Sequence, residues 1–137
     1  MPFVIDASIA ISWALDDEEH PTAFLSLDRI RNDEARVPGL WWYEVRNSLV
    51  TNERRKRLTE GDTAAFLQAL SRLALTLDHD ADEIQTLTLA RRHGLTVYDA
   101  VHLELAQREN IPLATLDGKL ANAARAEKVR LIEDASL

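Results

Sequence analysis

Short apolar runs alternate with segments of helical periodicity from one end of the chain to the other. The runs typical of strands occur at residues 2–5, 36–38, 75–77, 111–116 and 129–132. Strands that alternate with helices form mostly parallel sheets, because the chain must cross back over the sheet before the next strand begins. The pattern predicts an α/β fold with a parallel central sheet of four to five short strands flanked by helices.

Local signals place the helices between these strands. Pro21 suits the first turn of a helix, and Gly94 suits the residue that follows a helix. Thr59 followed three residues later by Asp62 resembles a capping box that opens a helix. We expect this helix and the one before it to form a hairpin arm. Further helices are predicted at about residues 8–15, 41–57, 81–93, 99–110 and 119–128.

Length and composition indicate one globular domain that spans residues 1–137. The chain has 46% hydrophobic and 28% charged residues with only 4 Gly and 4 Pro, which argues against disorder. The absence of Cys excludes disulfides and thiolate metal sites. A net charge of −7 argues against loose binding of nucleic acid, unless basic residues cluster locally or a metal ion reverses the local field.

The sequence carries no signal for a membrane or for export. No apolar stretch approaches the roughly 18 residues that a membrane-spanning helix needs. The apolar run near the first residue has no Lys or Arg before it and is interrupted by Asp6, unlike a signal peptide. We therefore expect a cytoplasmic protein with no membrane partner.

Four of the 23 acids occur where the apolar context would normally exclude them. Asp6 follows the run FVI and Asp117 follows LATL, so both are expected at the carboxyl ends of parallel strands, where such sheets place their ligand sites. Glu44 shares a helix face with apolar residues, and Asp99 lies at a helix start among apolar residues. Each Asp has a simpler interpretation as a helix cap or a helix-dipole partner, and Glu44 could reach back to a backbone amide.

Taken together, the four acids predict a metal site. Carboxylates that converge at one sheet edge repel one another unless a divalent cation lies between them. An all-oxygen site favours Mg²⁺, with Mn²⁺ as the alternative. His102 stands one turn from Asp99, at a spacing that suits a second ligand or a general base, but no third nitrogen or sulfur ligand supports zinc. A magnesium site of this kind suits hydrolysis of phosphate esters, with nucleic acid as the first candidate substrate.

The same residues resemble the PIN-domain nucleases, and most closely the VapC-like toxins of toxin–antitoxin pairs. The resemblance covers essentially the whole chain, and the four acids follow one another at separations of 38, 55 and 18 residues. It implies a metal-dependent endoribonuclease that cuts RNA, acts as a toxin, is inhibited by a small antitoxin and forms a homodimer. The matching stretches are VIDASI around Asp6, WWYEVRNSL around Glu44, LTVYDAVHLELA around Asp99 and ATLDGKLANAA around Asp117.

The resemblance also implies a role for individual residues. It makes Asp6, Asp99 and Asp117 ligands of Mg²⁺, and Glu44 the fourth acid, which holds a metal-bound water. Hydroxyl and amide side chains close to these acids in sequence are expected to support them by hydrogen bonds. These supporting residues are Ser8, Asn47 and Thr115.

One strongly basic stretch interrupts the acidic chain at Arg54, Arg55, Lys56 and Arg57. It could steer RNA toward the acids, or it could complement the dipole at the end of its helix.

Two other functions remain open. A receiver-type signalling module is also acidic and binds Mg²⁺, but it needs paired acids after the first strand, where this chain has Ala7 and Ser8 after Asp6. A catalytically silent PIN-like binding scaffold would be indicated by the loss of one acid, and all four are present.

Overall fold

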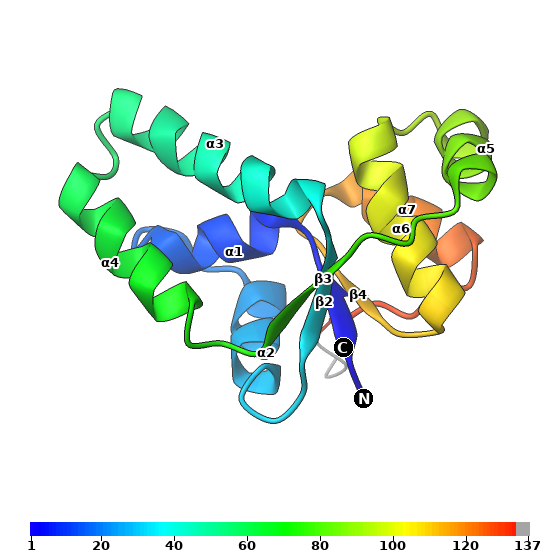
Figure 1. The fold of residues 1–137 in the computed structure, drawn as a ribbon, viewed down its shortest axis with the longest axis horizontal. Helices are drawn as coiled ribbons and strands as arrows, with labels where there is room; N and C mark the ends of the chain where they lie inside the picture. Colours follow the sequence, from blue (N-terminus) through cyan, green and yellow to red (C-terminus); the bar gives the residue numbers. More distant parts are fainter. Residues whose placement is uncertain (134–137) are drawn as a thin grey trace.

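The computed structural model describes residues 1–133, so the last four residues of the predicted domain lie outside the described part. Four strands form one sheet in the order β3-β2-β1-β4, and every neighbouring pair is parallel. This arrangement confirms the predicted α/β fold with a parallel central sheet (Figure 1). The strands are β1 (Phe3–Ile5), β2 (Ala35–Pro38), β3 (Leu75–Asp78) and β4 (Leu113–Ala114).

Two of the predicted strands are shorter than expected. The run at 111–116 pairs only at Leu113–Ala114, because the amide of Leu116 turns away from the ladder and donates to the Ser8 hydroxyl at 3.0 Å. The run at 129–132 contributes a single bridge between Leu131 and Leu113. It follows Lys128, whose backbone has a φ of 61° and bends the chain just before the bridge.

Seven helices occupy residues 1–133, at the places that the sequence predicts with small shifts at their ends. Thr59 and Asp62 form the predicted capping box, and Gly94 ends its helix with a φ of 62°. One helix begins two residues before its predicted start at Asp99, because the hydroxyl of Thr96 caps it by accepting from the Asp99 amide. The helices are α1 (Ala7–Ala14), α2 (Pro21–Arg29), α3 (Leu40–Arg54), α4 (Glu60–Leu70), α5 (Glu83–His93), α6 (Val97–Glu109) and α7 (Gly118–Ala126).

The sheet separates two layers of helices, and its central strand β1 is buried on both faces. Successive side chains of a strand point to opposite faces, so Phe3 and Ile5 pack with the core under α1, α2 and α3, whereas Val4 packs with the core under α5, α6 and α7. Figure 1 shows these two layers on either side of the sheet, with α3 and α4 extending as an arm. The arm is the predicted helical hairpin.

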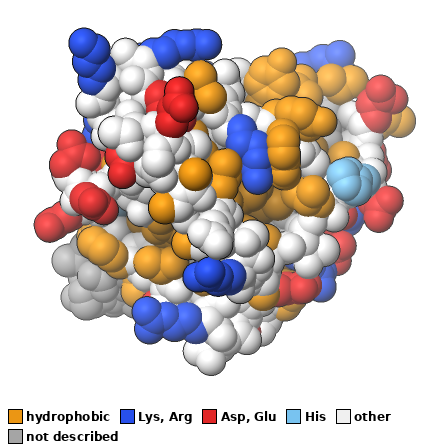
Figure 2. All heavy atoms as spheres, turned by 60° about the vertical axis from the view of Figure 1, so that its left-hand side comes forward, with side chains coloured by type: hydrophobic (Ala, Val, Ile, Leu, Met, Phe, Trp, Pro, Cys, Tyr) orange, Lys and Arg blue, Asp and Glu red, His pale blue; other side chains and the backbone are white. Residues whose placement is uncertain are grey.

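The arm and the edge strand β3 expose a partly apolar face. Figure 2, which brings the side of α3 and α4 forward, shows apolar side chains gathered over part of this face. A shallow groove is lined there by side chains of α3, the α4 end and β3, and Arg46 lies over the ring of Trp42 with its guanidinium 3.9 Å from the ring centre. Among the described residues, no helix is both long and apolar enough to cross a membrane.

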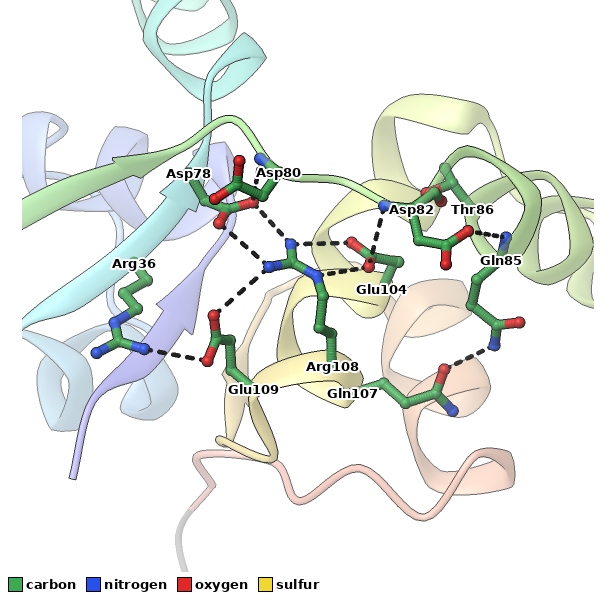
Figure 3. Close-up of polar contacts among 10 residues, drawn as sticks. All are labelled: Arg36, Asp78, Asp80, Asp82, Gln85, Thr86, Glu104, Gln107, Arg108 and Glu109. Carbon is green, nitrogen blue, oxygen red and sulfur yellow. Dashed lines mark hydrogen bonds and ion pairs between the residues drawn. The ribbon is translucent and has the colours of Figure 1, made fainter.

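A polar network fastens the connection between β3 and α5 to the helix α6. Arg108 lies between two carboxyl groups and donates to Glu104 at 2.7 Å and to Asp78 at 2.7 Å (Figure 3). The amide of Asp82 also donates to Glu104, at 3.3 Å. The network therefore fixes the path of residues 78–82 across α6.

Candidate metal centre

The candidate site lies where β1 and β4 end side by side. After β1 the chain adds β2 and then β3 on one side of β1, and it later adds β4 on the other side. The direction in which strands are added to the sheet therefore reverses between β1 and β4, although all four strands run parallel. Open parallel sheets place ligand sites in the crevice at such a reversal. Asp6 follows β1 directly, and Asp117 follows β4 and begins α7, so the sheet brings these two acids to one edge as the sequence predicts.

Asp6 is the centre of a hydrogen-bond network that joins the two strand ends. Its side chain is buried, with 5% of the residue exposed. One carboxylate oxygen accepts from the Ser8 hydroxyl and from the amide of Ile9 at 3.3 Å, and the other accepts from the Thr115 hydroxyl. The Thr115 hydroxyl in turn accepts from the amide of Asp117 at 3.0 Å. Ser8 and Thr115 thus hold Asp6 as supporting residues would.

The other two acids come from helices on either side of this edge. Glu44 lies in the first half of α3, and Asp99 lies in the first turn of α6. Burial, together with the charges of Asp99 and Asp6, raises the pKa of Glu44 to about 7. Burial and the adjacent Asp117 and Asp6 likewise raise the pKa of Asp99. The two helices and the two strand ends therefore bring four carboxyl groups together at the carboxyl ends of β1 and β4. There the negative charge of each acid makes ionisation of its neighbours less favourable.

No base within residues 1–133 forms an ion pair with Asp6, Asp99 or Asp117, and the nearest basic group to Glu44 is the ring of His102, at 3.8 Å. As they stand, no three Asp, Glu or His side chains among these residues form a preassembled metal site. The donor chemistry nevertheless fits a hard divalent cation. Oε1 of Glu44 is buried without a hydrogen-bond partner, and a cation would satisfy it while relieving the mutual repulsion of the acids.

The basic stretch singled out in the sequence lies away from the acids, whereas Asn47 stands one helical turn after Glu44. Asn47 is exposed on α3, and no hydrogen bond among the described residues joins it to them. The basic stretch Arg54–Arg57 lies at the far end of the arm, about 15 Å along α3 from Glu44 at 1.5 Å per residue. Arg57 there donates to Asp17 at 3.1 Å and to Glu18 at 3.2 Å. The structure therefore does not bring this basic stretch to the acidic centre.

Comparison with known proteins identifies the family to which a chain with this site belongs. The family described as "PIN domain" matches residues 3–126. The ribonuclease VapC3 of Pyrobaculum aerophilum is 32% identical over 124 residues, which cover 88% of this chain and 93% of that protein.

Solved structures share the same fold at low sequence identity. The crystal structure of PAE2754 from Pyrobaculum aerophilum superposes with a TM-score of 0.73 at 19% identity, covering 96% of this chain and 90% of that chain. The crystal structure of VapBC2 from Rickettsia felis, bound to a DNA fragment from their promoter, contains a chain that superposes with a TM-score of 0.65 at 14% identity. That match covers 96% of this chain and 97% of the other.

Proposed function

Because this chain belongs to the PIN-domain family, we propose that it is a metal-dependent endoribonuclease that acts as the toxin of a toxin–antitoxin pair. The observation that carries the proposal is the convergence of four carboxyl groups at the reversal point of the sheet, with raised pKa values at Glu44 and Asp99. The similarity to a VapC ribonuclease over most of both chains supports RNA as the substrate.

The proposed site uses the four acids in two ways. Asp6, Asp99 and Asp117 would hold Mg²⁺ or Mn²⁺ directly, and Glu44 would complete the set of four acids around the cation and orient the attacking water. When bound, a divalent cation supplies a Lewis acid that activates water and offsets the charge on the scissile phosphate. Ser8 and Thr115 hold the Asp6 carboxylate by hydrogen bonds, so this ligand is positioned before any cation arrives. The expected products carry a 5′-phosphate and a 3′-hydroxyl.

The similarity to toxin–antitoxin proteins also supports a partner. We propose that a small antitoxin protein binds this chain and blocks the acidic centre, and that the chain forms a homodimer. Within this proposal the basic stretch at the end of α3 is an outer contact for RNA, distant from the reacting phosphate. Asn47, one helical turn after Glu44, is a supporting residue of the acidic centre.

The test is cleavage of total cellular RNA by the purified chain with Mg²⁺, with EDTA, and with the variant Asp6→Asn. We expect discrete fragments with 5′-phosphate ends only from the unmodified protein with metal. Circular dichroism of Asp6→Asn shows whether its fold is retained. A folded Asp6→Asn protein that cuts RNA at the parent rate would remove the basis of the proposal.

A further inference from the structure

His102 lies on α6 one turn after Asp99 and is almost completely buried, with 1% of the residue exposed. Its Nδ1 lies 2.7 Å from the backbone carbonyl oxygen of Tyr98. A carbonyl oxygen only accepts hydrogen bonds, so Nδ1 carries the proton of this contact and the orientation of the ring is fixed. The opposite ring nitrogen, Nε2, then points away from Tyr98 and toward α3.

The atom that Nε2 faces is Oε1 of Glu44, at 3.8 Å. Both atoms are buried, and neither has a hydrogen-bond partner. Buried polar atoms without a partner are rare in folded proteins because each loses its contacts with water. A shift of about 1 Å in the Glu44 side chain would bring the pair to hydrogen-bond distance. A proton on either atom completes the bond.

We propose that His102 is a positioning residue that holds the carboxyl group of Glu44 through Nε2 at the acidic centre. The inference rests on the proposed metal-dependent function, and it adds His102 to the residues that support the acidic centre. Within residues 1–133, no Lys or Arg forms an ion pair with Glu44, so His102 is the partner available to fix its orientation. Asp99 and His102 share one face of α6, so this helix supplies both a cation ligand and the support for the acid opposite it.

Two substitutions at His102 separate the roles of its two nitrogens. In His102→Gln the side-chain amide reaches the place of Nε2 and can form a hydrogen bond with Glu44. In His102→Asn the shorter amide reaches only the place of Nδ1, so it can bond to the Tyr98 carbonyl but not to Glu44. A role in packing alone predicts similar effects for the two variants, whereas positioning of Glu44 predicts different ones.

The first measurement is the binding of Mn²⁺ to the purified full chain, followed by electron paramagnetic resonance, which does not depend on RNA cleavage. We expect His102→Asn to weaken Mn²⁺ binding by about 10-fold or more, as loss of a supporting residue does at other metal sites. His102→Gln should bind within about 3-fold of the parent. In RNA cleavage, raising the metal concentration should restore much of the rate of His102→Asn, because the loss lies in metal binding.

The control is the same substitution at His93, which also contacts a carboxylate, with Nε2 2.6 Å from Glu127, but lies on α5 away from the acids. His93→Asn should leave Mn²⁺ binding unchanged. In the Glu44→Gln background, His102→Asn should have no further effect, because its effect passes through Glu44. Additive losses, or equal losses in His102→Gln and His102→Asn, would overturn the proposal.

A measurement on the parent chain avoids reliance on folded variants. Side-chain nitrogen NMR follows the histidine rings directly, and addition of Mg²⁺ should move the Nε2 signal of His102 but not the signals of His93. An unmoved Nε2 signal at saturating Mg²⁺ would contradict the positioning role. A parent chain that binds Mn²⁺ but cuts no RNA would instead contradict the proposed function, and the metal-binding comparison would still test His102.

Discussion

Helix α6 carries two inward-facing carboxyl groups in opposite surroundings. Glu104 is buried and paired, because it accepts from Arg108 at 2.7 Å and from the Asp82 amide, and Arg108 also holds Asp78 (Figure 3). Asp99, five residues earlier, faces two other acids and no ion-pairing base among the described residues, so its pKa is raised. A carboxylate that is removed from water without a compensating base lowers the stability of the fold. The half-buried Asp99 is therefore expected to lower stability, whereas the paired Glu104 supports it.

The pKa directions on the two sides of α6 agree with this contrast. The Arg108 guanidinium holds the pKa of Asp78 below its usual range, and the pKa of Arg108 is itself raised by Glu104 and Asp78. At the other end of the helix, burial and neighbouring acids push the pKa of Glu44 upward to about 7. Compensated carboxyl groups are typical of structural networks, whereas uncompensated ones are typical of sites that bind a cation or perform chemistry.

The largest expected effect is the loss of RNA cleavage in Asp99→Asn. Removing one cation ligand is expected to lower the cleavage rate by on the order of 10³-fold, equivalent to about 4 kcal/mol of transition-state stabilisation. The metal-free protein should nevertheless unfold at an equal or higher temperature, because the substitution removes a charge that Asp117 and Asp6 oppose. Cleavage assays and thermal unfolding in EDTA check the two halves. A marked loss of stability would mean that Asp99 is structural.

The converse change is Glu104→Gln, which removes the ion pair of Arg108 with Glu104 and leaves the one with Asp78. We expect a loss of about 2–3 kcal/mol in the free energy of unfolding, because the buried ion pair with Glu104 is lost and Arg108 keeps only its outer partner Asp78. For a chain of this size the midpoint temperature should fall by roughly 10 °C. Metal-dependent cleavage per folded molecule should be unchanged at a temperature where the variant is folded. If Glu104→Gln lost as much cleavage activity as Asp99→Asn, Glu104 would not be purely structural and the two ends of α6 would not differ in role.

The third expected effect is a change with pH in the free energy of unfolding, caused by the titration of Glu44. Its pKa is about 7 in the folded protein and near 4.5 when unfolded, so the folded state holds the proton more tightly. The metal-free protein should therefore lose stability as the pH rises from about 4.5 through 7. Because solvent reaches about a third of this side chain, we expect only about 1–2 kcal/mol from it.

Urea unfolding in EDTA at pH 5.5 and at pH 7.5 checks this effect, with Glu44→Gln as the control. The parent should gain more stability on acidification than Glu44→Gln does, and the difference between them removes the contributions of other groups. At pH 7.5, saturating Mg²⁺ should remove the destabilisation of the parent relative to Glu44→Gln. Identical pH profiles for parent and variant would show that Glu44 is not under electrostatic stress.

The two regions also differ in how far the sequence predicts them. Asp6 and Asp117 could be placed together because parallel strands end at one edge, and Glu44 stood out as a carboxylate on an apolar helix face. The pairing of Arg108 with Glu104 is a local spacing of four residues, but its contact with Asp78 spans 30 residues and depends on the path of the chain across α6. Spacing along a helix carries no information about such a contact.

The sequence was least informative where two helices meet. The spacing of His102 from Asp99 is visible in the sequence, but its contact with Glu44 depends on the angle between α3 and α6. The end of β4 was also missed, because the hydroxyl of Ser8, more than a hundred residues earlier, takes the amide of Leu116 out of the ladder. Both cases involve polar contacts between elements that lie far apart in the sequence.

The smallest expected stability effect concerns Asp117, where a structural and a functional role coincide. Asp117 caps α7, and its carboxylate accepts from the Lys119 amide at 3.0 Å. Asn caps helices about as well as Asp, so Asp117→Asn should change the free energy of unfolding by less than about 0.5 kcal/mol, whereas Asp117→Ala should cost about 1 kcal/mol. Both variants should lose Mn²⁺ binding and RNA cleavage, because neither keeps the charge. Full activity in Asp117→Asn would reduce Asp117 to a helix cap and place it with Glu104 among the structural carboxyl groups.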